Sequence, residues 1–232
     1  SCEYPDNGNF SLNFDMAGNY IDLGVIENYS SKITVIAWIK SRDLEGESYW
    51  NTIIGGSPND IYFSIKDNKL TFCGQQTVPF YCTTLSTTSL NDNEWHHVAA
   101  TYDENGGVNN LKIYIDGDLE NQATIEAPAS FTPSNLRIGS NFQNLEGEFY
   151  IGNIGEIILW NDTLTSEHID SLYTNQSFDI QEGLLAHYKF NAGSGDILYD
   201  HSGNGNHGTI YGANWTYDID LHSGANLISF MS

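Results

Sequence analysis

Short runs of apolar and β-branched residues, each four to eight residues long, follow one another between residues 10 and 161. They are rich in Val, Ile, Tyr, Phe and Trp, which suit a pleated and half-buried surface. Turn-forming residues separate them, and Asp116-Gly117 fits a two-residue hairpin turn that requires positive φ. Strands at this spacing without intervening helices predict an all-β fold, a two-sheet antiparallel β-sandwich or jelly roll. The predicted strands read SLNF, YIDLG, ITVIAWIK, TIIGG, IYFSIK, KLTFC, WHHVAATY, LKIYID, LRIG and GEIILW.

One segment has helical rather than alternating periodicity. In LTSEHIDSLYT, Thr165 can cap the first turn, and Ile169, Leu172 and Tyr173 then fall on one face. The pattern predicts one short helix near residues 165–174.

The C-terminal part of the chain has further strand patterns around a Gly/Asn-rich loop. Residues 183–215 read GLLAHYKFNAGSGDILYDHSGNGNHGTIYGANW, which begins and ends as a strand. These strands either start a second unit or fold back onto the first sandwich. We expect them to fold back as closing strands, because unpaired strand edges are a liability. Residues 216–232 include the apolar run NLISF and form a C-terminal extension or the start of a next module.

The composition is that of a folded chain with an acidic surface. The 232 residues are 40% hydrophobic and 13% aromatic, and their formal net charge is −22. Such a chain can bury the core of one domain. The negative charge excludes nucleic acid as an expected partner, because phosphate binding depends on Lys and Arg. No stretch reaches the roughly 20 apolar residues of a membrane-spanning helix, so we expect no membrane insertion.

Three cysteines indicate an oxidising environment. Cys73 and Cys82 end the segment CGQQTVPFYC, which lies between the apolar runs KLTF and CTTL. If these runs pair as a hairpin, the two thiols face each other and can form a disulfide. Their spacing is not that of a zinc or redox motif, and disulfides are typical of exported proteins. Cys2 is then left over, so we expect its partner to lie upstream.

Several motifs occur in a specific order along residues 10–215. They are SLNFDMAGNYIDLG, ITVIAWIK, NEWHHVAATYD, LKIYIDGDL, LRIGS, GNIGEIILWNDTLTSEHIDSLY, LLAHYKFN and YDHSGNGNHGTIYGANW. In this order they resemble the laminin-G-like jelly rolls of the concanavalin A-like lectin/glucanase superfamily. The resemblance implies one such jelly roll over residues 10–215, within a large secreted bacterial cell-surface protein. The opening SCEY resembles the end of a cysteine-containing repeat, which implies that residues 1–9 are the tail of an upstream repeat.

Two features depart from the family pattern. The segment YDHSGNGNHGTIYGA normally opens such a domain, but here it lies near the C-terminal end. The family also usually has an Asp-Glu pair after the Gly-x-Ile of GNIGEI, where this chain has Gly155-Glu156. The missing Asp argues against a ligand role at that position.

The segment that begins at Asp200 copies the first half of a calcium loop. Oxygen-bearing side chains occupy its first, third and fifth positions, at Asp200, Ser202 and Asn204, and Gly205 is the sixth. The twelfth position, which should be Glu, is Tyr211, so other oxygens would have to complete the site.

Glu156, Asp196 and Asp15 are the candidates to supply those oxygens. Members of the family often hold a structural calcium near this loop, so the resemblance implies Ca²⁺ here. The alternative is a Gly/Asn turn held by side-chain-to-backbone hydrogen bonds, and Asp15 can likewise hold the turn at residues 17–19. The predicted metal ligands are Asp200, Ser202, Asn204, Asn206, Glu156 and Asp15.

The carboxylates do not form a recognisable catalytic pair. A glucanase needs two carboxyl groups close together on one strand. The acidic segments SRDLEGESYW and NLEGEFY lie beside Gly, where solvated loop residues are expected, and Glu156 has no acidic partner two residues on. We therefore predict that the chain is not an enzyme.

Two adjacent histidines, His96 and His97, are tempting as metal ligands or bases. Neighbouring residues on a strand face opposite sides, so they cannot serve one site. We expect a buried, hydrogen-bonded His97 and an exposed His96.

A sugar site would need exposed aromatic faces beside planar polar groups. Trp50 could stack on a sugar or could equally cap the core. The best-placed aromatic side chains are Tyr49, Trp50, Phe80 and Tyr81. Those expected in the core are Trp38, Trp95 and Trp160.

Together these features predict a non-catalytic, calcium-stabilised binding or adhesion module, with carbohydrate binding as the leading mode. Protein–protein adhesion and a structural spacer are the alternatives, and a glucanase-type glycoside hydrolase is less favoured. The expected partner is a glycan or a cell-surface protein. We expect the chain to be secreted or at the cell surface, as part of a larger multidomain protein.

Overall fold

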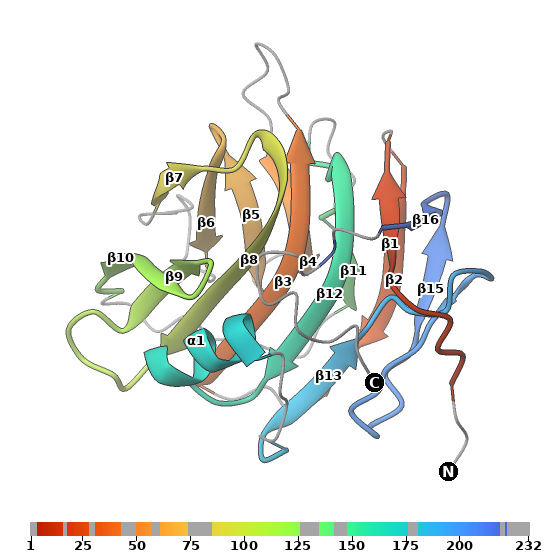
Figure 1. Cartoon of the computed structure of the whole chain (residues 1–232). Coiled ribbons are helices and arrows are strands. Elements are labelled where there is room, and N and C mark those ends of the chain that lie inside the picture. Colours follow the sequence, from red (N-terminus) through yellow and green to blue (C-terminus); the bar gives the residue numbers. More distant parts are fainter. Residues whose placement is uncertain are drawn as a thin grey trace.

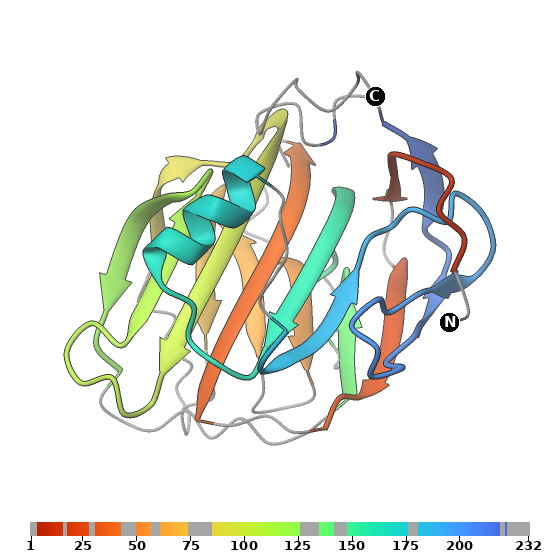
Figure 2. The ribbon, with the colours of Figure 1, turned by 60° about the horizontal axis from the view of Figure 1, so that its bottom comes forward.

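The computed structural model describes residues 4–15, 18–27, 31–42, 50–56, 61–73, 85–125, 135–141, 148–175, 181–218 and 221. Over these residues the chain forms two antiparallel sheets packed face to face, with a helix against the outside of one sheet (Figures 1 and 2). The predicted β-sandwich with a short helix is therefore confirmed.

Sheet A carries the helix and has β12 and β3 near its centre. The loop between β9 and β10 is the predicted two-residue turn, in which Asp116 and Gly117 have φ of 52° and 85°. The strand order is β10 (Asp118–Ala123), β9 (Leu111–Ile115), β8 (Asp92–Asp103), β3 (Lys32–Arg42), β12 (Gly152–Trp160), β1 (Phe10–Phe14) and β16 (Asn214–Tyr217), and β13 (Leu184–Tyr188) also pairs with β12.

Sheet B closes the other side of the core. Its strand order is β14 (Ile197–Leu198), β15 (Gly208–Tyr211), β2 (Tyr20–Val25), β11 (Asn135–Ile138), β4 (Trp50–Gly56), β5 (Tyr62–Lys66), β6 (Lys69–Cys73) and β7 (Leu85–Ser89).

The C-terminal strands join both sheets beside the N-terminal ones. β13 pairs with the second half of β12, β15 pairs with β2, and β16 pairs with β1. Figure 1 shows these blue strands next to the red β1 and β2. The segment after residue 183 therefore supplies strands to the same sandwich.

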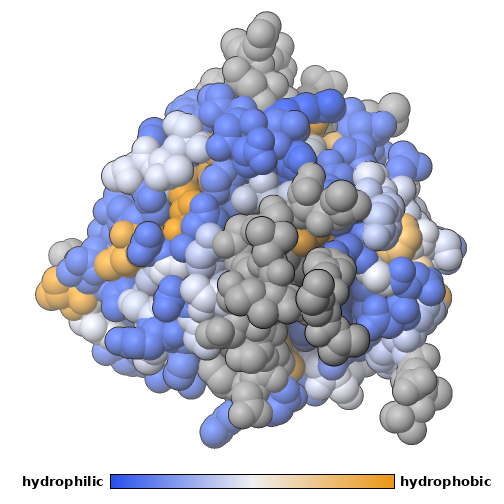
Figure 3. Space-filling model, in the orientation of Figure 1, coloured by the Kyte–Doolittle hydropathy of each residue, from blue (hydrophilic) through white to orange (hydrophobic). Residues whose placement is uncertain are grey.

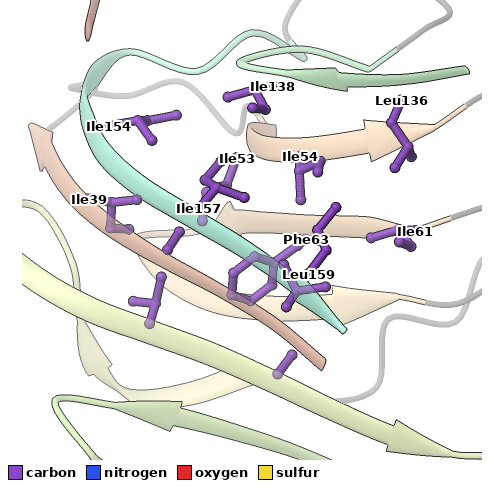
Figure 4. Close-up of a cluster of buried hydrophobic side chains, with 14 of the residues drawn as sticks. Ile39, Ile53, Ile54, Ile61, Phe63, Leu136, Ile138, Ile154, Ile157 and Leu159 are labelled. Atoms are coloured by element: carbon purple, nitrogen blue, oxygen red, sulfur yellow. The ribbon is translucent and has the colours of Figure 1, made fainter. Parts of the chain in front are cut away.

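The core lies between the sheets and consists of their inward-facing side chains. Ile157 and Leu159 of β12 pack toward Ile54, Phe63 and Ile138 of sheet B, and all five are fully buried (Figure 4). Because successive strand residues face opposite sides, the residues between them lie on the outer faces, where a binding site can form.

The helix α1 (Ser166–Asn175) covers part of the outer face of sheet A (Figure 2). The Thr165 hydroxyl accepts a hydrogen bond from the His168 N–H at 3.3 Å, which is the predicted N-cap. Ile169 and Leu172 are buried against Trp160. The described part of the chain contains no helix that is long and apolar enough to cross a membrane.

Three tryptophans are buried as predicted, but on the outer face of sheet A rather than between the sheets. Trp160 packs under α1, and Trp38 and Trp95 pack with Leu221. Gly155 makes this last contact possible, since a Cβ there would lie 2.4 Å from a methyl carbon of Leu221.

Gly152 is the first residue of β12 and lies against the backbone of β3, so substitution there should have a large effect. Its φ is 143°, and a Cβ there would lie 2.3 Å from the Lys40 carbonyl oxygen. Gly152→Ala should lower the free energy of unfolding by about 3 kcal/mol or more, because backbone strain adds to overlap with a backbone atom. Urea denaturation measures the loss.

Gly107→Ala is the matched control. Gly107 also has a positive φ, 70°, but nothing lies within 4 Å of a Cβ built there. This variant should lose only about 1 kcal/mol, from strain alone. Equal losses in the two variants would contradict the proposed overlap.

Candidate functional site

Asp200 is fully buried at the centre of the Gly/Asn-rich loop. Its Oδ1 accepts hydrogen bonds from the backbone N–H groups of His187 and Ser202, both at 2.9 Å. Its Oδ2 accepts from the Ser202 hydroxyl at 2.8 Å and from the Asn206 N–H at 2.9 Å. Both carboxylate oxygens are therefore engaged by donors of the protein itself.

The Asn side chains of this loop direct their donors at β13. Asn204 Nδ2 donates to the carbonyl oxygens of Leu184 at 2.8 Å and Leu185 at 3.0 Å. Asn206 Nδ2 donates to the Leu185 carbonyl oxygen at 2.9 Å. These bonds fasten the loop to the strand, as in the alternative interpretation of this segment, a Gly/Asn turn held by side-chain-to-backbone hydrogen bonds.

The residues predicted to bind calcium do not assemble around one point. Glu156 accepts a hydrogen bond from His187, Asp196 is exposed, and the N–H of Asp15 donates to Asn19 Oδ1 at 3.1 Å within a turn. Among the described residues, no three His, Cys, Asp or Glu side chains are grouped so as to hold a metal ion. Both oxygens of Asp200 and Oε1 of Glu156 are already hydrogen-bonded within the protein, and calcium binding by the chain stays a prediction.

Trp50 is the aromatic candidate that the structure describes. Its ring meets the ring of Tyr62 edge to face, with centroids 5.2 Å apart, and the Lys66 ammonium lies 4.7 Å from its centroid. Cys73 is buried at the end of β6. The other candidates, Tyr49, Phe80, Tyr81 and the predicted disulfide partner Cys82, lie outside the described residues.

Tyr62 is placed beside Trp50 by strand alternation. In β5, Phe63 and Ile65 face the core, so Tyr62, Ser64 and Lys66 face outward. Tyr62 lies opposite Gly55 of β4. Its hydroxyl accepts a hydrogen bond from the Thr52 hydroxyl at 3.3 Å. The same alternation is visible in the sequence IYFSIK, so this outward Tyr could have been predicted.

A carboxyl group completes this arrangement. Glu148 Oε2 accepts a hydrogen bond from Asn141 Nδ2 at 2.7 Å. The backbone of Asn141 lies over Gly55, since a Cβ on that glycine would be 3.4 Å from the Asn141 Cα. Burial raises the pKa of the Glu148 carboxyl, and burial raises the pKa of Tyr62, with a smaller contribution from the charge of Glu148. Glu148 lies in a loop as expected, but it is half-buried rather than fully solvated.

We call the set Trp50, Tyr62, Asn141 and Glu148 the β4–β5 face. Two aromatic rings offer apolar surface, and a half-buried carboxyl–amide pair offers hydrogen-bond acceptors and donors within one patch. Such a combination suits a ligand whose faces are apolar and whose edges carry hydroxyl groups.

The two adjacent histidines, His96 and His97, contact neighbouring side chains on different elements. His97 is 1% exposed as predicted, and its ring packs against Trp38. His96 is half-buried rather than exposed, because Nδ1 lies 2.8 Å from Asp116 Oδ2 and Nε2 lies 3.2 Å from Asp92 Oδ2. The hydrogen bond with Asp116 is the main cause that raises the pKa of His96. His96 thus ties β8 to the β9–β10 turn.

Comparison with known proteins gives matches over most of the chain. A family model described as the concanavalin A-like lectin/glucanases superfamily matches residues 15–170. A rat protein, sushi, von Willebrand factor type A, EGF and pentraxin domain-containing protein 1, is 26% identical over 207 residues. That match covers 83% of this chain and 6% of the rat protein. The mouse protein of the same name gives the same coverage, so the chain spans about 6% of the curated relatives it matches.

Solved structures share the fold at low sequence identity. A Bacteroides ovatus protein assigned to carbohydrate binding has a TM-score of 0.70 and 23% identity, over 90% of this chain and 60% of that one. A heptameric pentraxin from Limulus polyphemus has a TM-score of 0.60 and 12% identity, over 93% and 98%. Domain 4 of an extracellular arabinanase from Geobacillus stearothermophilus, solved with arabinotriose, has a TM-score of 0.52 and 20% identity, over 66% and 71%. At these identities the likeness concerns the fold alone.

The hydrogen bonds of Asp200 predict that it stabilises the loop without calcium. Asp200→Asn places an amide N–H₂ against N–H donors, so it should lower the free energy of unfolding by about 2 kcal/mol or more. The loss should be equal in millimolar calcium and in EDTA, as measured by urea denaturation. Asp196→Asn, at an exposed carboxylate in the same segment, is the control and should have no effect. A loss of stability seen only in calcium would contradict the proposal that hydrogen bonds, rather than calcium, hold this loop.

His96 predicts a pH-dependent contribution to stability. Its pKa is raised in the fold, so the protonated ring stabilises the chain fully below the unfolded pKa. This contribution is lost as the pH rises through the folded-state pKa. Wild type should exceed His96→Gln in free energy of unfolding by about 1 kcal/mol near pH 5.5 and by less near pH 9, measured by urea denaturation. A difference that grows with pH would contradict the pairing with Asp92 and Asp116.

Proposed function

The chain belongs to the concanavalin A-like lectin/glucanase superfamily, and we propose that it is a non-catalytic carbohydrate-binding module that holds a glycan on its β4–β5 face. The observation that carries this proposal is the contact of two outward aromatic rings, Trp50 and Tyr62, beside the hydrogen-bonded pair Glu148 and Asn141. Sugar rings have apolar C–H faces that pack on aromatic rings and hydroxyl edges that bond to carboxyl and amide groups.

The state of Glu148 supports ligand binding in particular. Because Glu148 is half-buried, solvent screens this carboxyl less than an exposed one. The same burial raises its pKa. A ligand hydroxyl that donates to a half-buried carboxylate forms a stronger hydrogen bond than one that donates to an exposed carboxylate. Asn141 fixes one carboxyl oxygen and so orients the group before a ligand arrives.

The surroundings of Glu156 support a non-catalytic role. A glucanase places nucleophile and acid/base carboxylates close together. Glu156 is bonded to His187 at 2.7 Å, and the next outward position on its strand is Ile158. The strand that could carry such a pair therefore has one carboxylate, and its Oε1 is held by His187.

We propose a secreted or cell-surface setting within a larger chain. The curated relatives are more than ten times longer than this chain, and their name describes several extracellular module types. A disulfide between Cys73 and Cys82 would suit that setting. The net charge of −22 favours neutral glycans over sulfated or other anionic ones.

A glycan array followed by calorimetry tests the proposal. Trp50→Ala should weaken binding of the best neutral glycan about 30-fold, because the ring supplies a stacking face, and Glu148→Gln should weaken it roughly tenfold. Tyr217→Ala is the matched aromatic control, since Tyr217 is 62% exposed on β16 in the other sheet. Unchanged affinity in the first two variants would overturn the assignment of this face.

Protein–protein adhesion is the alternative function. The acidic surface would then select a basic partner, whose association would be fast at low salt and slow at high salt. An array without hits, together with salt-sensitive binding to cells, would favour this alternative.

A further inference from the structure

A cavity of about 370 Å³ lies on the outer face of sheet A, away from the β4–β5 face of sheet B. Its walls come from β12, β13, the end of α1, the N-terminal segment before β1, and Leu221. We call it the β13 cavity. Its volume falls within the range of ligand pockets, at the end that suits a small ligand.

The floor of the β13 cavity is a carboxylate–imidazole pair. Glu156 Oε1 lies 2.7 Å from His187 Nε2, and the side chains are 19% and 8% exposed. The His187 backbone N–H is held by Asp200 Oδ1 at 2.9 Å. Buried Asp200 therefore fixes the position of His187, and His187 in turn holds the carboxylate of Glu156.

Further polar groups surround this pair. Asn191 lines the cavity and is 8% exposed, and the exposed side chains of Lys189 and Asp6 lie at its edge. The N-terminal segment that carries Asp6 is attached here, because the Asn7 N–H donates to the Asn191 carbonyl oxygen at 2.8 Å. The cavity therefore presents hydrogen-bond donors and acceptors, including positively and negatively charged side chains, around a small space.

Apolar groups make up the remaining walls. Phe10, Ile158, Leu172 and Leu221 all line the β13 cavity. On the described residues of this side, hydrophobic positions are scattered among hydrophilic ones (Figure 3). Such a surface suits a small ligand in a pocket better than a broad protein interface.

We propose that the β13 cavity is a second binding site, which takes a single neutral sugar ring. Each sugar hydroxyl both donates and accepts, so one hydroxyl can donate to Glu156 while its neighbours accept from Lys189 or the Asn191 amide. The C–H face of the ring then packs on Phe10 and Leu172. A volume of about 370 Å³ favours one ring rather than a chain of sugars.

Titration with monosaccharides, followed by ¹⁵N–¹H NMR, tests this site. The probes are the methyl glycosides of glucose, galactose, mannose, fucose and N-acetylglucosamine, each up to about 0.1 M, because a single ring is expected to bind with a Kd of about 1 mM. At least one should give saturable shifts at the amides of Asn9, Glu156 and residues 187–191. No saturable shift with any probe would overturn the proposal.

Two variants at the cavity and one control assign the site. Glu156→Gln keeps the hydrogen bond with His187 and should weaken the monosaccharide about tenfold, and the exposed Lys189→Met should also weaken it. Glu148→Gln, on the opposite face, should leave this titration unchanged. If Glu148→Gln abolishes the shifts while Glu156→Gln does not, the sugar binds at the β4–β5 face and the second site is wrong. Conversely, if the shifts depend on Glu156, the second site is supported even if no glycan binds the β4–β5 face.

Discussion

The edge of β12 that faces away from β3 is shared by two strands, and the rest of sheet A is arranged around this division. The first half of β12 pairs with β1, and the second half pairs with β13. Between them the register against β3 shifts at Gly155, the position that also admits Leu221. This shift is a bulge in the β3–β12 ladder, on the other edge of β12. The inner side chains of β12 fill the core, while Glu156 and Ile158 remain available to the outer face.

The C-terminal segment depends on the same division, because β13 is where the Asp200 loop is attached. Buried Asp200 accepts four hydrogen bonds, and one of them comes from the backbone of His187 in β13. The loop therefore acts as a clamp that holds β13 against β12. Both outer faces of the sandwich then carry a carboxyl group with a fixed partner, Glu148 with Asn141 and Glu156 with His187.

Local patterns predicted the elements of this fold well, because alternation and capping act over a few residues. The N-cap at Thr165 and the hairpin turn at Asp116-Gly117 are of this kind. The surroundings of Glu148 and Asp200 were beyond such patterns. Glu148 lies in an acidic, Gly-flanked segment with no local sign of burial. Asp200 has a calcium-like spacing, but its oxygens accept hydrogen bonds from Ser202, Asn206 and His187. What local patterns could not give are the contact of Asp200 with His187 in β13 and that of Asn141 with Gly55 in β4, which the packed sheets bring near.

A crystal structure of the chain with the glycan that binds best tests the central claim most directly. A sugar ring in contact with Trp50 or Tyr62, with a hydroxyl bonded to Glu148, is the predicted result. A glycan bound elsewhere on the molecule, with these three residues uncovered, would contradict the assignment of the β4–β5 face.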